Sequence, residues 1–102
     1  MLRGEAMAIG LFMEFKGIGA AKYDAIMQET GLTGDKGWWP PGLLSHYAGR
    51  TTEGWCVVDV WHSQKSFDAY LSGRLGPALT RIDGVPRPRV TPFTVHKHYK
   101  QW

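Results

Sequence analysis

The chain has 102 residues and is 43% hydrophobic, which is typical of one folded domain and too apolar for an intrinsically disordered protein. Its net charge is +3, and the basic residues are scattered without a nucleic-acid-binding motif, so we expect no nucleic-acid partner. The single cysteine, Cys56, excludes an internal disulfide, and no apolar run is long enough to span a membrane. We therefore expect a cytoplasmic protein with no membrane partner.

Hydrophobic spacing and turn residues divide the chain into strands and helices. Residues 1–6 lack the apolar stretch of a signal peptide, so we expect a flexible leader, with Met1 or Met7 as the start, before a single domain at 7–102. The predicted elements are, in order, a strand at 8–15, a helix at 20–30, strands at 43–50 and 55–62, a helix after Ser63, and a strand at 90–99.

Local signals mark the ends of the predicted helices. Gly31 is a typical stop for the first helix, and Ser63 is a typical N-cap for the second. Gly76 and Pro77 should break or kink the second helix, after which a short turn follows. Four residues are predicted to share one side of this helix: Phe67, Tyr70, Leu71 and Leu75.

The order of elements predicts an α+β fold of the ferredoxin-like βαββαβ type, with a four-stranded antiparallel sheet and two helices on one face. Pro92 favours an edge position for the last strand. The strand at 55–62 is apolar on both faces, with Val57 and Trp61 on one and Val58 on the other. Because the helices cover only one face, we expect a second copy of the chain to cover the other in a homodimer.

Three stretches carry a family resemblance: the strand 54–61 (GWCVVDVW) leading into His62, Ser63 and Phe67, the tract 42–49 (GLLSHYAG), and 75–79 (LGPAL). Together they resemble the dimeric α/β-barrel superfamily, in particular small bacterial proteins of the antibiotic-biosynthesis-monooxygenase type. The resemblance implies a homodimeric α/β barrel with a pocket between sheet and helices in each subunit. Members of this superfamily include cofactor-free monooxygenases, haem-degrading enzymes, polyketide cyclases and isomerases. The resemblance therefore leaves several activities open, and the choice among them must be argued from the residues of the site.

His46 and Asp59 are the candidate catalytic pair. If the hairpin turn at 51–54 sets Arg50 opposite Trp55, then His46 lies opposite Asp59, within about 5.5 Å at Cβ. A carboxylate among apolar residues needs a partner, and a His–Asp pair can act as a general base. The alternative is a pair that only satisfies a buried polar position.

A group of aromatic side chains is predicted to bind the substrate. Rings of this kind stack on flat ligands, so we expect an aromatic or polyketide-like molecule. Trp38, in a loop rich in glycine and proline, could close over the pocket or lie at the dimer interface. The predicted substrate-binding residues are Tyr23, Trp38, Trp61, Phe67 and Tyr70.

His96 and His98 alternate on the predicted last strand and could bind a metal or haem with a further ligand. No HExxH motif or cysteine cluster accompanies them, and we predict no metal and no cofactor. The leading interpretation is a cofactor-independent, monooxygenase-like oxidoreductase of secondary metabolism. The alternatives are a polyketide cyclase or isomerase with the same base, and a non-catalytic barrel that binds a small molecule or serves a stress response.

Overall fold

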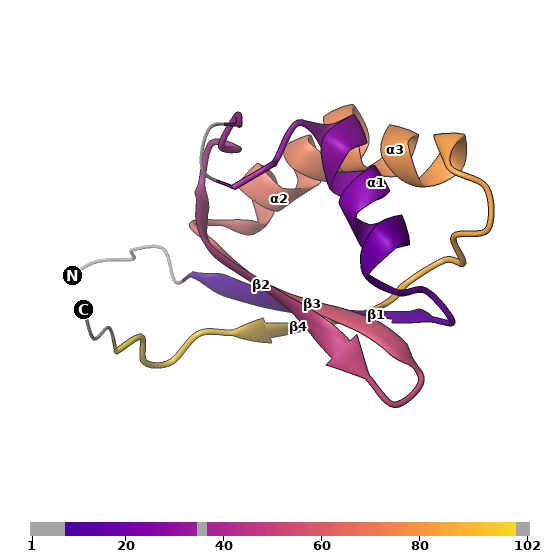
Figure 1. Cartoon of the computed structure of the whole chain (residues 1–102). Helices are drawn as coiled ribbons and strands as arrows, with labels where there is room; N and C mark the ends of the chain where they lie inside the picture. Colours follow the sequence, from indigo (N-terminus) through magenta and orange to yellow (C-terminus); the bar gives the residue numbers. More distant parts are fainter. Residues whose placement is uncertain (1–7, 35–36, 100–102) are drawn as a thin grey trace.

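A layer of helices lies on one face of a four-stranded antiparallel sheet in the computed structural model, which describes residues 8–34 and 37–99 (Figure 1). The strands are ordered β2-β3-β1-β4 in the sheet. This is the predicted ferredoxin-like α+β arrangement, and the predicted leader lies outside the described residues. The elements are β1 (Ile9–Lys16), α1 (Ala20–Thr30), β2 (Leu43–Thr51), β3 (Gly54–Trp61), α2 (Gln64–Tyr70), η1 (Leu71–Leu75), α3 (Gly76–Arg81) and β4 (Arg89–Thr94).

The core lies between the sheet and the helices. Along β1, Leu11, Met13 and Phe15 point to this side and are buried, as their alternate spacing predicts. Burial of each such side chain stabilises the fold by roughly 1.5–3 kcal/mol. The other buried hydrophobic residues are Ile18, Ile26, Met27, Leu32, Leu43, Val57, Trp61, Phe67, Tyr70, Leu75 and Ala78.

Helix α1 has the predicted length and buried stripe. Ile26, Met27 and Thr30 face the core, and Tyr23 lies one turn earlier on the same stripe. The helix ends at Gly31, whose φ of 90° is left-handed and whose N–H donates to the Met27 carbonyl oxygen. This stop sets the point at which the chain leaves α1 and turns back toward β2.

The second helical segment differs from the prediction. Ser63 caps α2 as expected, since its hydroxyl accepts a hydrogen bond from the Ser66 N–H at 3.1 Å. The helix does not break at Gly76 and Pro77. A π-helical turn, η1, precedes them and leads directly into α3, where Pro77 occupies the first turn and needs no N–H partner. Leu71, predicted to share one side with Phe67, Tyr70 and Leu75, is exposed, whereas the other three are buried.

Strand β4 is shorter than predicted. It lies at the sheet edge, as Pro92 indicated, but it ends at Thr94 rather than continuing to residue 99. The reason is the length of its neighbour: Thr94 pairs with Ile9, the first residue of β1. His96 and His98 therefore lie beyond the strand and are exposed, which contradicts their predicted alternation on a strand face.

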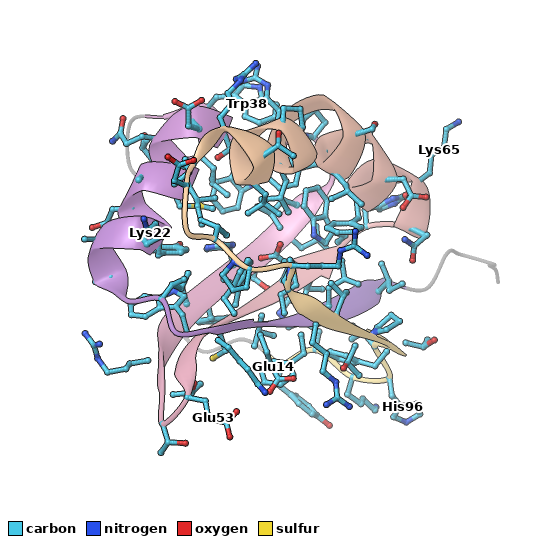
Figure 2. All side chains as sticks on the ribbon, turned by 90° about the vertical axis from the view of Figure 1, so that its right-hand side faces the viewer. Glu14, Lys22, Trp38, Glu53, Lys65 and His96 are labelled. Carbon is cyan, nitrogen blue, oxygen red and sulfur yellow. The ribbon has the colours of Figure 1, made fainter. Side chains whose placement is uncertain are left out.

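No described helix covers the other face of the sheet (Figure 1). Tyr47, Val58 and Phe12 are cross-strand neighbours there, and the Tyr47 side chain is 67% exposed. Figure 2 shows Glu14 on this far side, opposite Trp38 at the helix layer. None of the described helices is long and apolar enough to cross a membrane.

Candidate active site

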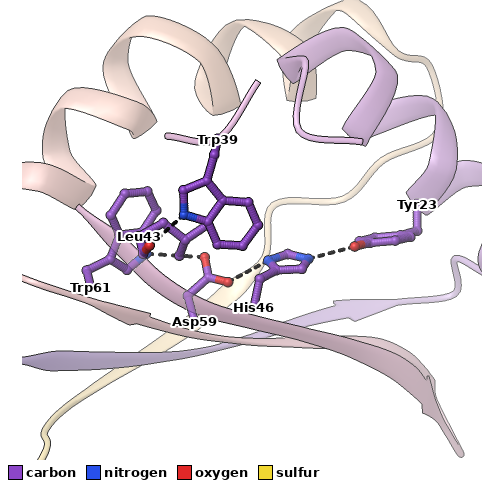
Figure 3. A network of polar contacts seen from close by, with 6 residues as sticks. All are labelled: Tyr23, Trp39, Leu43, His46, Asp59 and Trp61. Carbon is purple, nitrogen blue, oxygen red and sulfur yellow. Dashed lines mark hydrogen bonds and ion pairs between the residues drawn. The ribbon is translucent and has the colours of Figure 1, made fainter. Parts of the chain in front are cut away.

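The β2–β3 hairpin brings His46 and Asp59 together. Arg50 pairs with Trp55 and His46 with Asp59, so the predicted register is confirmed; it shifts only at a bulge between Leu43 and Ser45. The His46 Nδ1 atom lies 2.6 Å from Asp59 Oδ1 (Figure 3). The predicted pairing is therefore confirmed, while the catalytic role of the pair stays a prediction.

Asp59 is a buried carboxylate with two donors. Its side chain accepts hydrogen bonds from His46 Nδ1 and, at 3.2 Å, from Trp61 Nε1. Because a carboxylate can only accept, the hydrogen on the His46 ring is assigned to Nδ1. Buried polar groups of this kind are stable only when they are paired, and Asp59 has a donor at each oxygen.

Tyr23 extends this pair into a chain of three residues. Its hydroxyl oxygen lies 2.6 Å from His46 Nε2, and in the neutral ring Nε2 accepts the hydroxyl hydrogen (Figure 3). Burial raises the pKa of Tyr23 to about 12, and the negative charges of Asp59 and, more weakly, Asp24 act in the same direction. The hydroxyl is therefore protonated at neutral pH and remains a donor to the imidazole.

A cavity of about 370 Å³ opens beside Tyr23 and His46, between α1, the loop that follows it and β2. Trp39 forms part of its wall, and the Trp39 indole N–H donates to the Leu43 carbonyl oxygen at 2.7 Å, which fixes the ring (Figure 3). The described residues that line the cavity are Tyr23, Asp24, Met27, Gln28, Leu32, Thr33, Gly34, Trp39 and His46. The imidazole and the tyrosine hydroxyl thus adjoin a space large enough for a small molecule.

Comparison with known proteins gives no match to a family model and no significant match among curated proteins. Solved structures do match. SnoaB, a cofactor-independent oxygenase from Streptomyces nogalater, aligns over 94% of this chain and 100% of its own, with a TM-score of 0.67 and 16% identity. The chain shares the ferredoxin-like α+β fold of this oxygenase. The predicted resemblance is confirmed at this level.

Two further solved structures share this fold. NE2512 from Nitrosomonas europaea, a protein of unknown function, aligns over 94% of this chain and 96% of its own, with a TM-score of 0.70 and 15% identity. A Chloroflexus aurantiacus protein assigned as an antibiotic biosynthesis monooxygenase aligns over 92% and 98%, with a TM-score of 0.52 and 19% identity. At these identities the likeness shows the fold, and the chemistry must be argued from the side chains.

Within this fold, Tyr23 is the one predicted substrate-binding residue found on the cavity wall. Trp61 and Phe67 are buried in the core, where their rings pack edge to face at a centroid distance of 5.7 Å. Tyr70 is also buried, and it borders a small enclosed space of about 20 Å³ beside Asp59 and, on its other side, the groove next to Trp38, but not the 370 Å³ cavity. The assignment of these three rings to the pocket wall is therefore corrected, because their helical and strand periodicity turns them into the core.

Trp38 lies away from the cavity. The Arg74 guanidinium sits 4.1 Å from the centre of its ring, and the ring stacks on Tyr70 on the protein side. This holds Trp38 over a separate groove, so its predicted role as a lid over the pocket is corrected. The neighbouring Trp39 takes the place at the cavity. Sequence reasoning missed it because nothing in the pair of tryptophans distinguishes the ring that turns inward.

Sequence reasoning also missed two roles near Asp59. Trp61 donates to the carboxylate rather than lining a pocket, a role suggested only by its spacing of two residues on the same strand face. Tyr23 reaches His46 from another element. Among the described residues, no group of three or more His, Cys, Asp or Glu side chains could hold a metal ion.

Proposed function

We propose that this chain is a small-molecule enzyme that carries out a cofactor-independent, monooxygenase-like oxidation of a flat aromatic or polyketide-like substrate. The observation that carries the proposal is the His46 imidazole at the cavity wall, oriented from behind by the buried Asp59 carboxylate. A carboxylate in this position fixes the tautomer of the ring and stabilises the imidazolium that forms when it accepts a proton. The fold shared with SnoaB is consistent with this chemistry.

The reaction begins with removal of a phenolic or enolic proton from the substrate by the base. The resulting anion carries negative charge on a ring carbon, which can transfer electrons to dioxygen and form a carbon–oxygen bond. For an activated CH2 group, one oxygen atom becomes the carbonyl oxygen and the other leaves as water. The substrate supplies all the electrons, so the enzyme's task is to ionise it and to shield the anion from solvent.

The lining of the cavity supports this substrate class. Trp39 and Tyr23 offer ring faces, and Met27 and Leu32 offer apolar surface. Among the described lining residues Asp24 is the only charged side chain other than the titratable His46, and it is a carboxylate. Such a wall favours a neutral phenol or enol over its anion, so the substrate would enter protonated and lose its proton inside the cavity.

We also propose that the functional form is a homodimer. The open face of the sheet carries exposed Tyr47 and Phe93 beside Phe12 and Val58, and an apolar surface of this kind is costly in water. A second copy packed sheet to sheet would cover it. Sedimentation of the wild type should give a dimer and Val58→Asp a monomer. A stable wild-type monomer at micromolar concentration would contradict the proposal.

Oxygen uptake with a panel of anthrones and naphthols tests the function. Wild-type protein should consume oxygen with saturation kinetics, and His46→Gln should lower kcat by about 100-fold or more, the usual contribution of a general base. His98→Gln is the matched control, because His98 is exposed and lies beyond β4. Proton exchange into a bound substrate without oxygen uptake would indicate a cyclase or isomerase instead. Failure of the whole panel to quench tryptophan fluorescence would reject the proposed substrate class.

A further inference from the structure

We propose that the Tyr23 hydroxyl is the group that exchanges the proton with the substrate, and that His46 and Asp59 act through it. This inference rests on the proposed function and names a further catalytic residue for it. It assigns Tyr23 a task beyond the substrate positioning expected from the sequence. The hydroxyl would work in both directions, first accepting a proton from the substrate and later returning one.

The geometry places Tyr23 in front of the base. Asp59, His46 and Tyr23 lie in a row, with 2.6 Å from Oδ1 to Nδ1 and 2.6 Å from Nε2 to the hydroxyl oxygen (Figure 3). The side chain of His46 is 14% exposed and that of Asp59 3%. Both ring nitrogens of His46 are therefore occupied. A substrate in the cavity cannot hydrogen-bond to Nε2 while Tyr23 holds it, but it can reach the remaining lone pairs of the tyrosine oxygen.

Two protonation states of the imidazole give the hydroxyl two opposite roles. With a neutral ring, Tyr23 donates to Nε2, and its oxygen can accept a hydrogen bond from a substrate hydroxyl. In the transfer, the substrate O–H bond breaks and its proton joins the Tyr23 oxygen, while the tyrosine's own proton moves to Nε2. The products are a substrate anion, a neutral Tyr23 and an imidazolium ion paired with Asp59.

The reverse transfer protonates the oxygenated intermediate. With a protonated ring, Nε2–H donates to the Tyr23 oxygen, and the tyrosine hydrogen turns toward the cavity. When dioxygen has accepted electrons from the substrate anion and bonded to its carbon, the terminal oxygen of the peroxide carries negative charge. Tyr23 can protonate that oxygen while it takes the proton back from Nε2, which restores the neutral imidazole. The product of this step is a hydroperoxide. Loss of its terminal OH together with the hydrogen left on the same carbon releases water and leaves the carbonyl group, so no proton from solvent is needed in this cycle.

The surroundings of Tyr23 favour proton transfer through a neutral hydroxyl, a proton relay, over a tyrosine that is permanently ionised and acts as a base. The pKa of about 12 follows from burial first and from the nearby acidic groups Asp59, Tyr70 and Asp24. A free phenolate at this position is therefore unstable at neutral pH, and proton gain must accompany proton loss. The ring is held independently of the hydroxyl, since it packs on Trp55 at a centroid distance of 5.3 Å.

That packing makes Tyr23→Phe a suitable test, because the variant keeps the ring contact and loses only the hydroxyl. In oxygen uptake with an anthrone, kcat should fall by about 100-fold or more while KM changes by less than about 3-fold. Tyr99→Phe is the matched control, since Tyr99 is 84% exposed. In parallel, Tyr23→Phe should unfold in one cooperative thermal transition and sediment as the wild type does, which shows that the variant folds.

A second measurement separates a relay from a structural role. Replacement of Tyr23 by a fluorotyrosine keeps the hydroxyl and its geometry but makes the hydroxyl more acidic, so the pH profile of kcat should shift while KM does not. A relay also predicts a solvent deuterium isotope effect on kcat in the wild type that is lost in Tyr23→Phe.

The results that overturn the inference differ from those that overturn the function. If wild-type protein oxidises the anthrone and Tyr23→Phe keeps more than a third of its kcat, His46 contacts the substrate directly and only the relay is wrong. An unchanged pH profile with fluorotyrosine has the same meaning. If the wild type takes up no oxygen with any substrate of the panel, the proposed function fails and the relay fails with it.

Discussion

Asp59→Asn is the substitution that tests the site most sharply, because it removes one buried charge and leaves the size of the side chain unchanged. The asparagine would keep its amide oxygen on the Trp61 indole N–H and turn its NH2 toward His46 Nδ1. Nδ1 must then accept rather than donate, so the hydrogen of the neutral ring moves to Nε2. Nε2–H would donate to the Tyr23 oxygen, and the imidazole would lose its ability to accept a proton there.

Asp59→Asn should change both the stability of the fold and the activity. Replacing a hydrogen bond to a charged group, worth about 1.5–3 kcal/mol, with a neutral one worth about 0.5–1.5 kcal/mol lowers the free energy of unfolding by roughly 1–2 kcal/mol. Part of this loss is offset because a neutral asparagine avoids the cost of burying the Asp59 charge. The activity should fall far more, by about 1,000-fold to 10,000-fold in kcat, because the wrong tautomer disables the base.

Nitrogen-15 NMR of the histidine rings is the direct assay. In the wild type, the His46 ring should carry its hydrogen on Nδ1, and in Asp59→Asn it should carry it on Nε2. Oxygen uptake and thermal unfolding measured on the same samples give the two magnitudes, with Asp83→Asn as the control at an exposed carboxylate. The reasoning is refuted if Asp59→Asn keeps the Nδ1–H tautomer or more than about a tenth of the wild-type kcat.

Three further predictions concern stability. The folded state favours the neutral form of Tyr23, because its pKa is raised from 10 to about 12. The resulting contribution to the free energy of unfolding is complete below pH 10 and is lost as the pH rises to about 12, and the alkaline unfolding of Tyr23→Phe should lack this loss. Trp61→Ala empties a fully buried site and should cost about 3–5 kcal/mol in denaturant unfolding, and a loss below about 1 kcal/mol would contradict this packing. Gly54→Ala places Cβ 2.2 Å from a β1 carbonyl oxygen and should destabilise by at least about 1 kcal/mol, whereas Gly49→Ala, with open space around it, should not.

Short-range patterns in the sequence determined most of the fold and one contact of the site. The alternation of β1, the buried stripe of α1, the stop of α1 at Gly31 and the cap of α2 at Ser63 each depend on residues a few positions apart, so they can be recognised without a structure. The pairing of His46 with Asp59 belongs to the same class, because a tight turn between adjacent strands sets their register.

Only the tertiary structure decided how distant elements meet. Tyr23 contacts His46 because α1 crosses the sheet at that position, and Trp39 rather than Trp38 reaches the cavity because Arg74 and Tyr70 hold Trp38 elsewhere. The π-helical turn and the end of β4 likewise depend on packing and on the length of a neighbouring strand. Local patterns show which side of an element is buried, but the contacts made by that side depend on the packing of the whole chain. The sequence therefore contained the imidazole and its carboxylate as a recognisable pair, and the fold added the hydroxyl in front of them.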